Sequence, residues 1–149
     1  MFERYTEPAR RAIFFAVYEA KRFGSTHIEP EHLLLGLLHD PQSLANKLFG
    51  LNAHADSLRL KMEQKYPSLN PRPKNGDLPL SDSGKRVLIH AAEEADRIGN
   101  PLIDTEHMLL GLLCEKESHA AKLLSEVGVE LASARHIVAP PAGHTPDST

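Results

Sequence analysis

The residues that most suggest chemistry are a glutamate and a histidine that occur as a pair twice, each time at the start of an apolar run. Residues 30–38 read PEHLLLGLL, and residues 105–113 read TEHMLLGLL. A zinc-protease motif contains such a pair, but it needs a second histidine one helical turn away. The positions one turn away are Ile28 and Ile103. Without a second ligand on the same face, we expect no metal site.

Other catalytic patterns are missing as well. The nearest approach to a phosphate-binding loop is Gly84-Lys85-Arg86, which lacks the upstream glycine and the hydroxyl residue of that motif. The repeats offer no nucleophile in a strained turn, so the sequence predicts no Ser/His/Asp arrangement. We therefore expect a protein that is not an enzyme and needs no cofactor, and a hydrolase is the least supported class of function.

The amino-acid composition limits the kinds of partner and the cellular compartment that we expect for the protein. The formal net charge is −3 with no run of Lys and Arg, which argues against nucleic-acid binding. The apolar segments are too short to span a membrane, and the N-terminus lacks the apolar core of a signal peptide. Cys114 has no second cysteine to pair with, and its apolar neighbours predict a small buried side chain. These features favour a reducing, cytoplasmic environment.

Each Glu-His pair lies at the start of a predicted helix. Glu29 or Asp104 stands at the N-cap position, and Pro30 or Thr105 opens the first turn. Behind the pair, apolar residues face nearly every direction, which is typical of a helix buried on all sides. We expect these two helices to form the centre of a small bundle, with Glu and His at the end that reaches the surface.

The paired residues also have explanations that involve no ligand. A glutamate in a first helical turn stabilises the helix dipole by roughly 0.3–1 kcal/mol, so Glu31 and Glu106 are as readily structural as functional. For the two histidines, capping or packing is the favoured explanation. Gly36 and Gly111 each cost about 1 kcal/mol inside a helix relative to alanine. Their presence in both copies predicts a close approach of two helices.

The chain is a tandem duplication. Residues 6–38 align with residues 81–113 without a gap, at a constant offset of 75, and many aligned positions are identical. In each copy a first helix begins after Thr6 or Ser81 and ends at Gly24 or Gly99. Two further helices follow the central one. Their apolar residues are Leu44, Ala45, Leu48, Phe49, Ala55, Leu58 and Met62 in the first copy, and Ala120, Leu123, Leu124, Leu131, Ala134 and Ile137 in the second.

These patterns predict an all-α protein of two tandem, pseudo-symmetric four-helix repeats, eight helices in one globular domain. Residues 1–66 form the first repeat, the Pro- and Gly-rich residues 67–80 a linker, and residues 81–138 the second repeat. Residues 139–149 are rich in Pro, Ser and Thr, and we expect a disordered tail. Each repeat is small, so an apolar face between them is expected.

The doubled Glu-His-x-Leu-Leu-Gly-Leu-Leu, preceded by Gly and Ile at fixed spacing, resembles the Clp N-terminal repeat domain of ClpA- and ClpC-type AAA+ unfoldases. The opening residues 2–7, FERYTE, are similar to ClpC, and the resemblance covers residues 2–138. It implies two four-helix repeats in one globule and binding without catalysis. The implied partners are adaptor proteins, phosphoarginine-tagged substrates and the Clp ATPase/protease complex.

The resemblance also implies binding residues. In bacterial ClpC proteins each repeat uses the start of its first helix for the phosphate and the Glu of its Glu-His pair for the guanidinium. The matching residues here are Thr6 with Glu31 in the first repeat and Ser81 with Glu106 in the second, with Arg10 and Lys85 one turn further along adding positive charge. A helix N-terminus is a natural anion site, and a carboxylate accepts two parallel guanidinium hydrogen bonds. Glu7 and Asp82 compete with phosphate there, and Leu80 replaces the aromatic Tyr5.

Two alternatives stay open. The chain is either a piece of a full unfoldase or a stand-alone Clp-N protein, and the character of residues 139–149 favours the second. A different class of function is a structural accessory or assembly factor, which binds a Clp protease or chaperone ring and recognises no tagged substrate.

Overall fold

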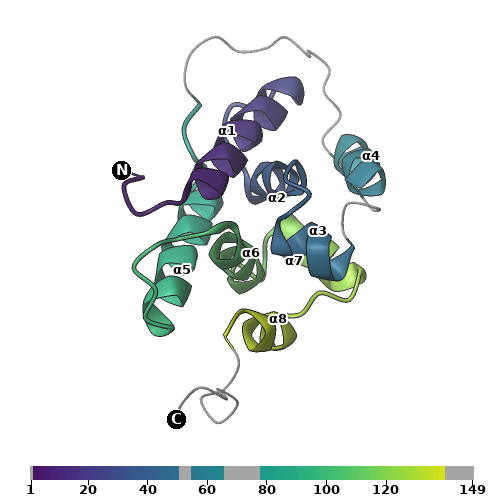
Figure 1. The fold of residues 1–149 in the computed structure, drawn as a ribbon. Helices are drawn as coiled ribbons and strands as arrows, with labels where there is room; N and C mark the ends of the chain where they lie inside the picture. The colour runs from purple at the N-terminus through teal and green to yellow at the C-terminus, as the bar shows by residue number, and fades with distance from the viewer. Residues whose placement is uncertain (1, 51–54, 66–77, 140–149) are drawn as a thin grey trace, which may run out of the picture.

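The computed structural model describes residues 2–50, 55–65 and 78–139, and every regular element within them is a helix (Figure 1). The described residues form α1 (Glu7–Arg22), α2 (Pro30–Leu38), α3 (Leu44–Phe49), α4 (Ala55–Lys65), α5 (Asp82–Arg97), α6 (Thr105–Cys114), α7 (His119–Glu126) and α8 (Leu131–Val138). The predicted all-α fold with four helices in each half is confirmed. Most of the predicted linker, and the predicted tail from residue 140, lie outside the described residues, so these boundaries stay predictions.

The first helix of each repeat begins and ends as its sequence predicts. Thr6 Oγ1 accepts the backbone N–H of Ala9 (3.2 Å), and Ser81 Oγ accepts that of Gly84 (3.0 Å), so both hydroxyls are N-caps. After the last turn, Gly24 has φ 67° and Gly99 has φ 73°, in the left-handed region that favours glycine. The four positions repeat at the offset of 75, so the duplication preserves the stop and start signals.

The central helices α2 and α6 are buried as predicted. All nine residues of α2 are buried, and Leu34 and Leu109 are each about 1% exposed. A Cβ at Gly36 would overlap the carbonyl oxygen of Ala12 in α1, and one at Gly111 would overlap that of Val87 in α5. Each glycine therefore permits the first and second helices of its repeat to touch, as their recurrence predicts.

Two reciprocal backbone contacts join the repeats. Tyr5 forms an isolated β-bridge with Ile103, and Ile28 forms one with Leu80. Tyr5 corresponds to Leu80 and Ile28 to Ile103 at the offset of 75. The two contacts are therefore related by a pseudo-two-fold axis, as in the interface of a symmetric dimer. The segment before each first helix is consequently paired with the segment before the second helix of the other repeat.

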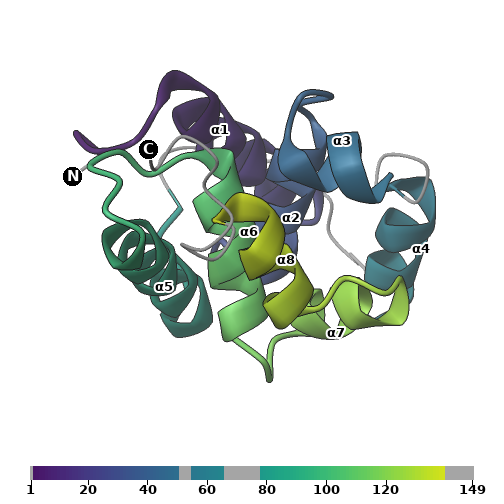
Figure 2. The same cartoon turned by 60° about the horizontal axis from the view of Figure 1, so that its bottom comes forward.

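The apolar core is continuous across the two repeats, which confirms the expected apolar face between them. Figure 2 shows α6 near the middle of the molecule, with α5 on one side, α8 across it and α3 and α4 on the other side. Buried leucines of α2, α6 and α7 belong to the same cluster. At positions 48, 49, 55, 58 and 62 the structure describes the helical backbone and not the side chains, so their predicted apolar contacts stay predictions. Ile137 of α8 is 43% exposed, contrary to its expected role in the core.

A buried glutamate in the first helix of each repeat binds the fourth helix by ion pairing. In the first repeat, Glu19 Oε2 accepts a hydrogen bond from Arg59 Nη2 of α4 (3.0 Å) and lies 2.7 Å from His39 Nε2. Burial alone would raise its pKa, but the hydrogen bonds with His39 and Arg59 outweigh burial and lower the pKa of Glu19. This carboxylate therefore stays charged and fixes α4 to α1.

The second repeat has the same arrangement with one different partner. Arg135 Nη2 of α8 donates to Glu94 Oε2 (2.6 Å), and Arg97 Nη2 donates to Glu94 Oε1 (2.8 Å). These bonds outweigh burial and lower the pKa of Glu94 to about 2. Cys114 takes the place of His39, with its Sγ 3.6 Å from Glu94 Oε2, and burial followed by the Glu94 charge raises its thiol pKa. Cys114 is half-buried against a carboxylate, so its predicted apolar burial is only partly right.

Candidate functional site

The start of α1 lies against the start of α6, in the other repeat. Thr6 N–H donates to the carbonyl of Ile103 (3.0 Å), and Thr6 Oγ1 donates to Asp104 Oδ1 (2.8 Å). Asp104 is the N-cap of α6, and Glu106 follows two residues later. The structure therefore brings Thr6 together with the Glu106 end of α6.

The start of α5 lies against the segment that leads into α2. Ser81 N–H donates to the carbonyl of Ile28 (3.0 Å), and a Cβ at Gly84 would come within 2.7 Å of that same oxygen. Ile28 precedes α2, whose first turn carries Glu31. Ser81 is therefore grouped with Glu31, as Thr6 is with Glu106.

This grouping corrects the pairing expected within each repeat. The rings of His32 and Phe23 are 5.9 Å apart, so α2 starts at the C-terminal end of α1. Thr6 caps the opposite end of that helix, and 16 residues of helix span about 24 Å. Thr6 and Glu31 are therefore not brought together. The sequence repeat showed equivalent positions but carried no information on which repeat supplies each neighbour.

The two glutamates of the Glu-His pairs lie in different surroundings. Glu31 is only 4% exposed, whereas Glu106 is partly exposed. Burial, followed by the charge of Asp104, raises the pKa of Glu106. The expectation that both pairs reach the surface is wrong for Glu31 and for both histidines, because the central helices are covered up to their first turns.

The two histidines cap their own helices, which confirms the favoured structural explanation. His32 Nδ1 accepts the backbone N–H of Glu29, and His107 Nδ1 accepts that of Asp104, both at 2.9 Å. This is the side-chain half of a capping box, with histidine in the place of the usual Glu or Gln. Burial lowers the pKa of His32 to about 4 and also lowers that of His107, which keeps the accepting rings neutral.

The two predicted cations lie on the exposed sides of the first helices. Arg10 donates from Nε and Nη2 to the carbonyl of Phe2 (3.3 and 3.2 Å), and its Nη1 is 3.9 Å from Glu7. Lys85 is exposed at one end of a groove beside α5. Arg10 therefore holds the N-terminal segment, while Lys85 places a positive charge at the edge of the groove.

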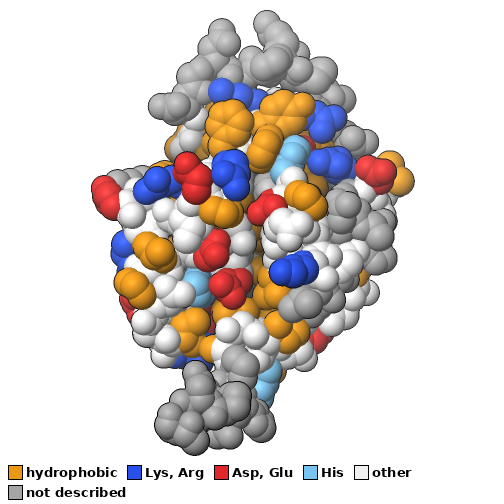
Figure 3. Space-filling view, viewed as in Figure 1, with side chains coloured by type: hydrophobic (Ala, Val, Ile, Leu, Met, Phe, Trp, Pro, Cys, Tyr) orange, Lys and Arg blue, Asp and Glu red, His pale blue; other side chains and the backbone are white. Residues whose placement is uncertain are grey.

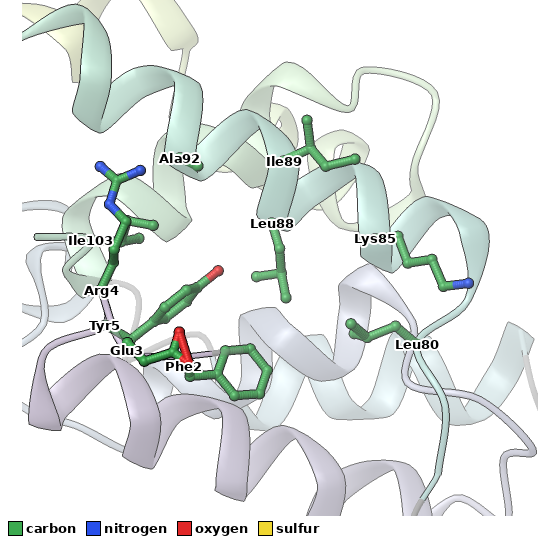
Figure 4. Close-up of a pocket in the computed structure, with 10 residues that line it drawn as sticks. All are labelled: Phe2, Glu3, Arg4, Tyr5, Leu80, Lys85, Leu88, Ile89, Ala92 and Ile103. Atoms are coloured by element: carbon green, nitrogen blue, oxygen red, sulfur yellow. The ribbon is translucent and has the colours of Figure 1, made fainter.

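An apolar groove of about 460 Å³ runs between the N-terminal segment and α5 (Figure 4). Its apolar lining consists of Phe2, Tyr5, Leu80, Leu88, Ile89, Ala92 and Ile103. Its polar edges are Glu3, Arg4 and Lys85, and Arg4 is fixed by Asp96 (2.7 Å). An apolar cavity with a few charged groups at its rim is the usual form of a binding site.

Sequence reasoning missed this groove. One signal was present, because Ile89 lies outside the buried stripe of α5 and is 55% exposed. The other wall could not be foreseen, since it depends on the bridge that holds Tyr5 beside Ile103.

The described residues contain neither a cluster of metal-ligand side chains nor a helix of membrane-spanning character. In that part of the chain, no three His, Cys, Asp or Glu side chains come together as metal ligands. None of the helices described is long and apolar enough to cross a membrane.

Comparison with known proteins agrees with the fold. Residues 4–144 match the family described as the Clp repeat (R) N-terminal domain. The chain is 34% identical over 149 residues to the chloroplastic chaperone protein ClpC of Pisum sativum, and 34% identical over 143 residues to the ClpC/MecB negative regulator of genetic competence of Bacillus subtilis. These matches cover 99% and 93% of the chain but only 16% and 17% of the two relatives.

Solved structures give the same result. The N-terminal domain of the caseinolytic protease associated chaperone ClpD from Arabidopsis thaliana superposes with a TM-score of 0.72 at 29% identity, covering 91% of this chain and 92% of that one. The Hsp104 N-terminal domain from Candida albicans, at 22% identity and a TM-score of 0.68, covers 89% of this chain and 87% of its own and shows a likeness of fold alone. The doubled motif, the eight helices and these matches together show that the chain belongs to the Clp repeat (R) N-terminal domain family.

Proposed function

We propose that the chain is a non-catalytic protein-recognition module of the Clp chaperone and protease system, which binds adaptor proteins or tagged substrates for an AAA+ unfoldase. The groove between the N-terminal segment and α5 carries this proposal. It is open, apolar and charged at its edges, which suits the side chains of a partner segment. Tyr5 and Ile103 line one wall of the groove, and the next residue in each segment is Thr6 or Asp104. The groove therefore adjoins the start of α1 and the start of α6.

In the tagged form of this function, Glu106 binds the guanidinium of a phosphorylated arginine. Its carboxylate is partly exposed, and Asp104 beside it disfavours its charge, so a neighbouring cation would be stabilised there. The phosphate then lies at the start of α1, where backbone N–H groups and the helix dipole favour an anion. Glu7 and Asp104 oppose the phosphate, and Arg10 offsets them. The pair of Ser81 with Glu31 is the equivalent site, but Glu31 is buried.

Calorimetric titration with free phosphoarginine tests this proposal, with arginine and inorganic phosphate as separate controls. We expect saturable binding by the wild type, a loss of at least tenfold in affinity for Glu106→Ala, and a smaller change for Glu31→Ala. Circular dichroism checks that each variant is folded.

A phosphoarginine peptide with a leucine beside the modified residue extends the test to the groove. We expect it to bind more tightly than free phosphoarginine, and Ile89→Asp to remove the difference. A folded wild type that binds neither ligand would contradict tag recognition. Binding to an assembled Clp ring that is unchanged by Glu106→Ala would instead support the accessory function.

A further inference from the structure

We propose that the outer face of α1 is a second docking surface, which takes an acidic amphipathic segment of a partner protein. Phe14 and Tyr18 lie one turn apart on this face and are 68% and 51% exposed. In Figure 3 a group of hydrophobic side chains lies over α1, bordered by Lys and Arg side chains and a histidine. We call Phe14, Phe15 and Tyr18 the aromatic patch. It lies outside the groove and the Glu106 site, so the inference goes beyond the proposed function.

Neighbouring side chains hold the aromatic patch in place. The ring of Phe15 stacks on that of His39, with centroids 4.2 Å apart and planes nearly parallel. Phe14 packs edge-on against Phe15 at 5.5 Å. The guanidinium of Arg22 lies 6.0 Å from the centroid of the Tyr18 ring. An ordered aromatic surface loses little conformational entropy on binding, which favours its use as an anchor for a partner.

The charges around the aromatic patch select the chemistry of the partner. Helix α1 carries the cations Arg10, Arg11, Lys21 and Arg22. Of its two carboxylates, Glu19 is buried in the ion pair with α4, which leaves Glu7 at the far N-terminal end. The chain as a whole has a net charge of −3, so this positive face contrasts with the rest of the molecule. Carboxylates on a partner complement it.

Helix α5 provides an internal control for what the fold requires. The positions equivalent to Phe14, Tyr18 and Lys21 hold Ile89, Glu93 and Asp96. The same backbone is therefore formed with an acidic residue in place of Tyr18 and of Lys21. Because folding does not require two exposed rings or this excess of cations on α1, they indicate an interaction.

A designed 16-residue helical peptide with leucines along one face and glutamates elsewhere is the probe, with the same helix carrying lysines as its control. The test variant is Tyr18→Glu/Lys21→Asp, which gives α1 the residues of α5. Phe14→Gln is a second variant, and Glu93→Gln on α5 is the matched control. Fluorescence anisotropy follows binding, and circular dichroism confirms folding.

We expect the wild type and Glu93→Gln to bind the acidic peptide, and the double variant and Phe14→Gln to bind at least tenfold more weakly. Binding should weaken as salt is raised, because the rim charges are exposed. Equal binding of the acidic and basic peptides, or equal binding by the wild type and the double variant, would overturn the proposal. Sedimentation velocity tests whether a second copy of the chain occupies this face instead. If the wild type self-associates and the double variant does not, the face would be assigned to a second copy, and the proposal of an acidic partner would be overturned.

Discussion

The starts of α2 and α6 have the same cap but different access to solvent. In both, a histidine ring accepts the N–H of the N-cap residue at 2.9 Å. The glutamate before that histidine is 4% exposed in α2, as Glu31, and partly exposed in α6, as Glu106. The repeated Glu-His pair therefore has two separable parts. The histidine is fixed by helix capping in both repeats, whereas the exposure of the glutamate depends on the repeat.

The largest expected effect on stability comes from substitutions in the core, where the two repeats should respond alike. Leu34→Ala and Leu109→Ala each remove a side chain that is about 1% exposed. We expect either change to lower the free energy of unfolding by about 2–5 kcal/mol, the usual cost of a cavity at a buried leucine. Urea denaturation measures it. A loss below about 1 kcal/mol at both sites would show that the central helices are not the core.

A smaller effect is the pH dependence of stability that comes from the capping histidine His32. The pKa of His32 is about 4 in the folded chain and about 6.5 when unfolded, so the unfolded state binds more protons between those values. The stability contributed by the neutral ring is therefore complete above pH 6.5 and is lost as the pH falls towards 4. From pH 7 to pH 5 we expect a loss of about 2 kcal/mol from this group.

His32→Gln separates capping from titration, because glutamine also serves in a capping box but does not titrate. Denaturation of both proteins at pH 7, 6 and 5 should show a shallower pH dependence for the variant. Parallel curves for the two proteins would rule out His32 as the titrating group. The same pair of measurements for His107→Gln asks whether the second repeat responds in the same direction, since burial also lowers the pKa of His107.

The smallest effect separates the two N-cap hydroxyls. Thr6→Ala and Ser81→Ala each remove a cap worth about 1 kcal/mol of unfolding free energy. Thr6 should cost more, because its hydroxyl also donates to Asp104 across the repeat interface. Thermal or urea unfolding compares them, with Thr6→Ser as the control that keeps both bonds. Equal losses for the two alanine variants would mean that the bond to Asp104 adds no stability.

Most of the fold follows from local sequence. The helix starts at Thr6 and Ser81 and the helix ends at Gly24 and Gly99 depend on neighbours within one or two turns. Such rules are readable from a sequence. The duplication then predicts that both halves have the same fold.

The candidate site depends on contacts between distant segments, and these were not predictable. Thr6 and Asp104 are 98 residues apart, and no local pattern distinguishes this neighbour from the equivalent one in the same repeat. The burial of Glu31 and the wall of the groove formed by Tyr5 have the same origin. The residues were identifiable one by one, but their grouping was not.

The pairing across repeats is tested most directly by two double variants titrated with phosphoarginine. Glu31→Ala/Ser81→Ala keeps Thr6 and Glu106, the pair formed across the repeats. Glu31→Ala/Thr6→Ala instead keeps Ser81 and Glu106, the pair formed within one repeat. We predict one bound ligand for the first variant and none for the second. The reverse result would contradict the site assembled between the repeats, and no binding by either variant or by the wild type would contradict phosphoarginine recognition itself.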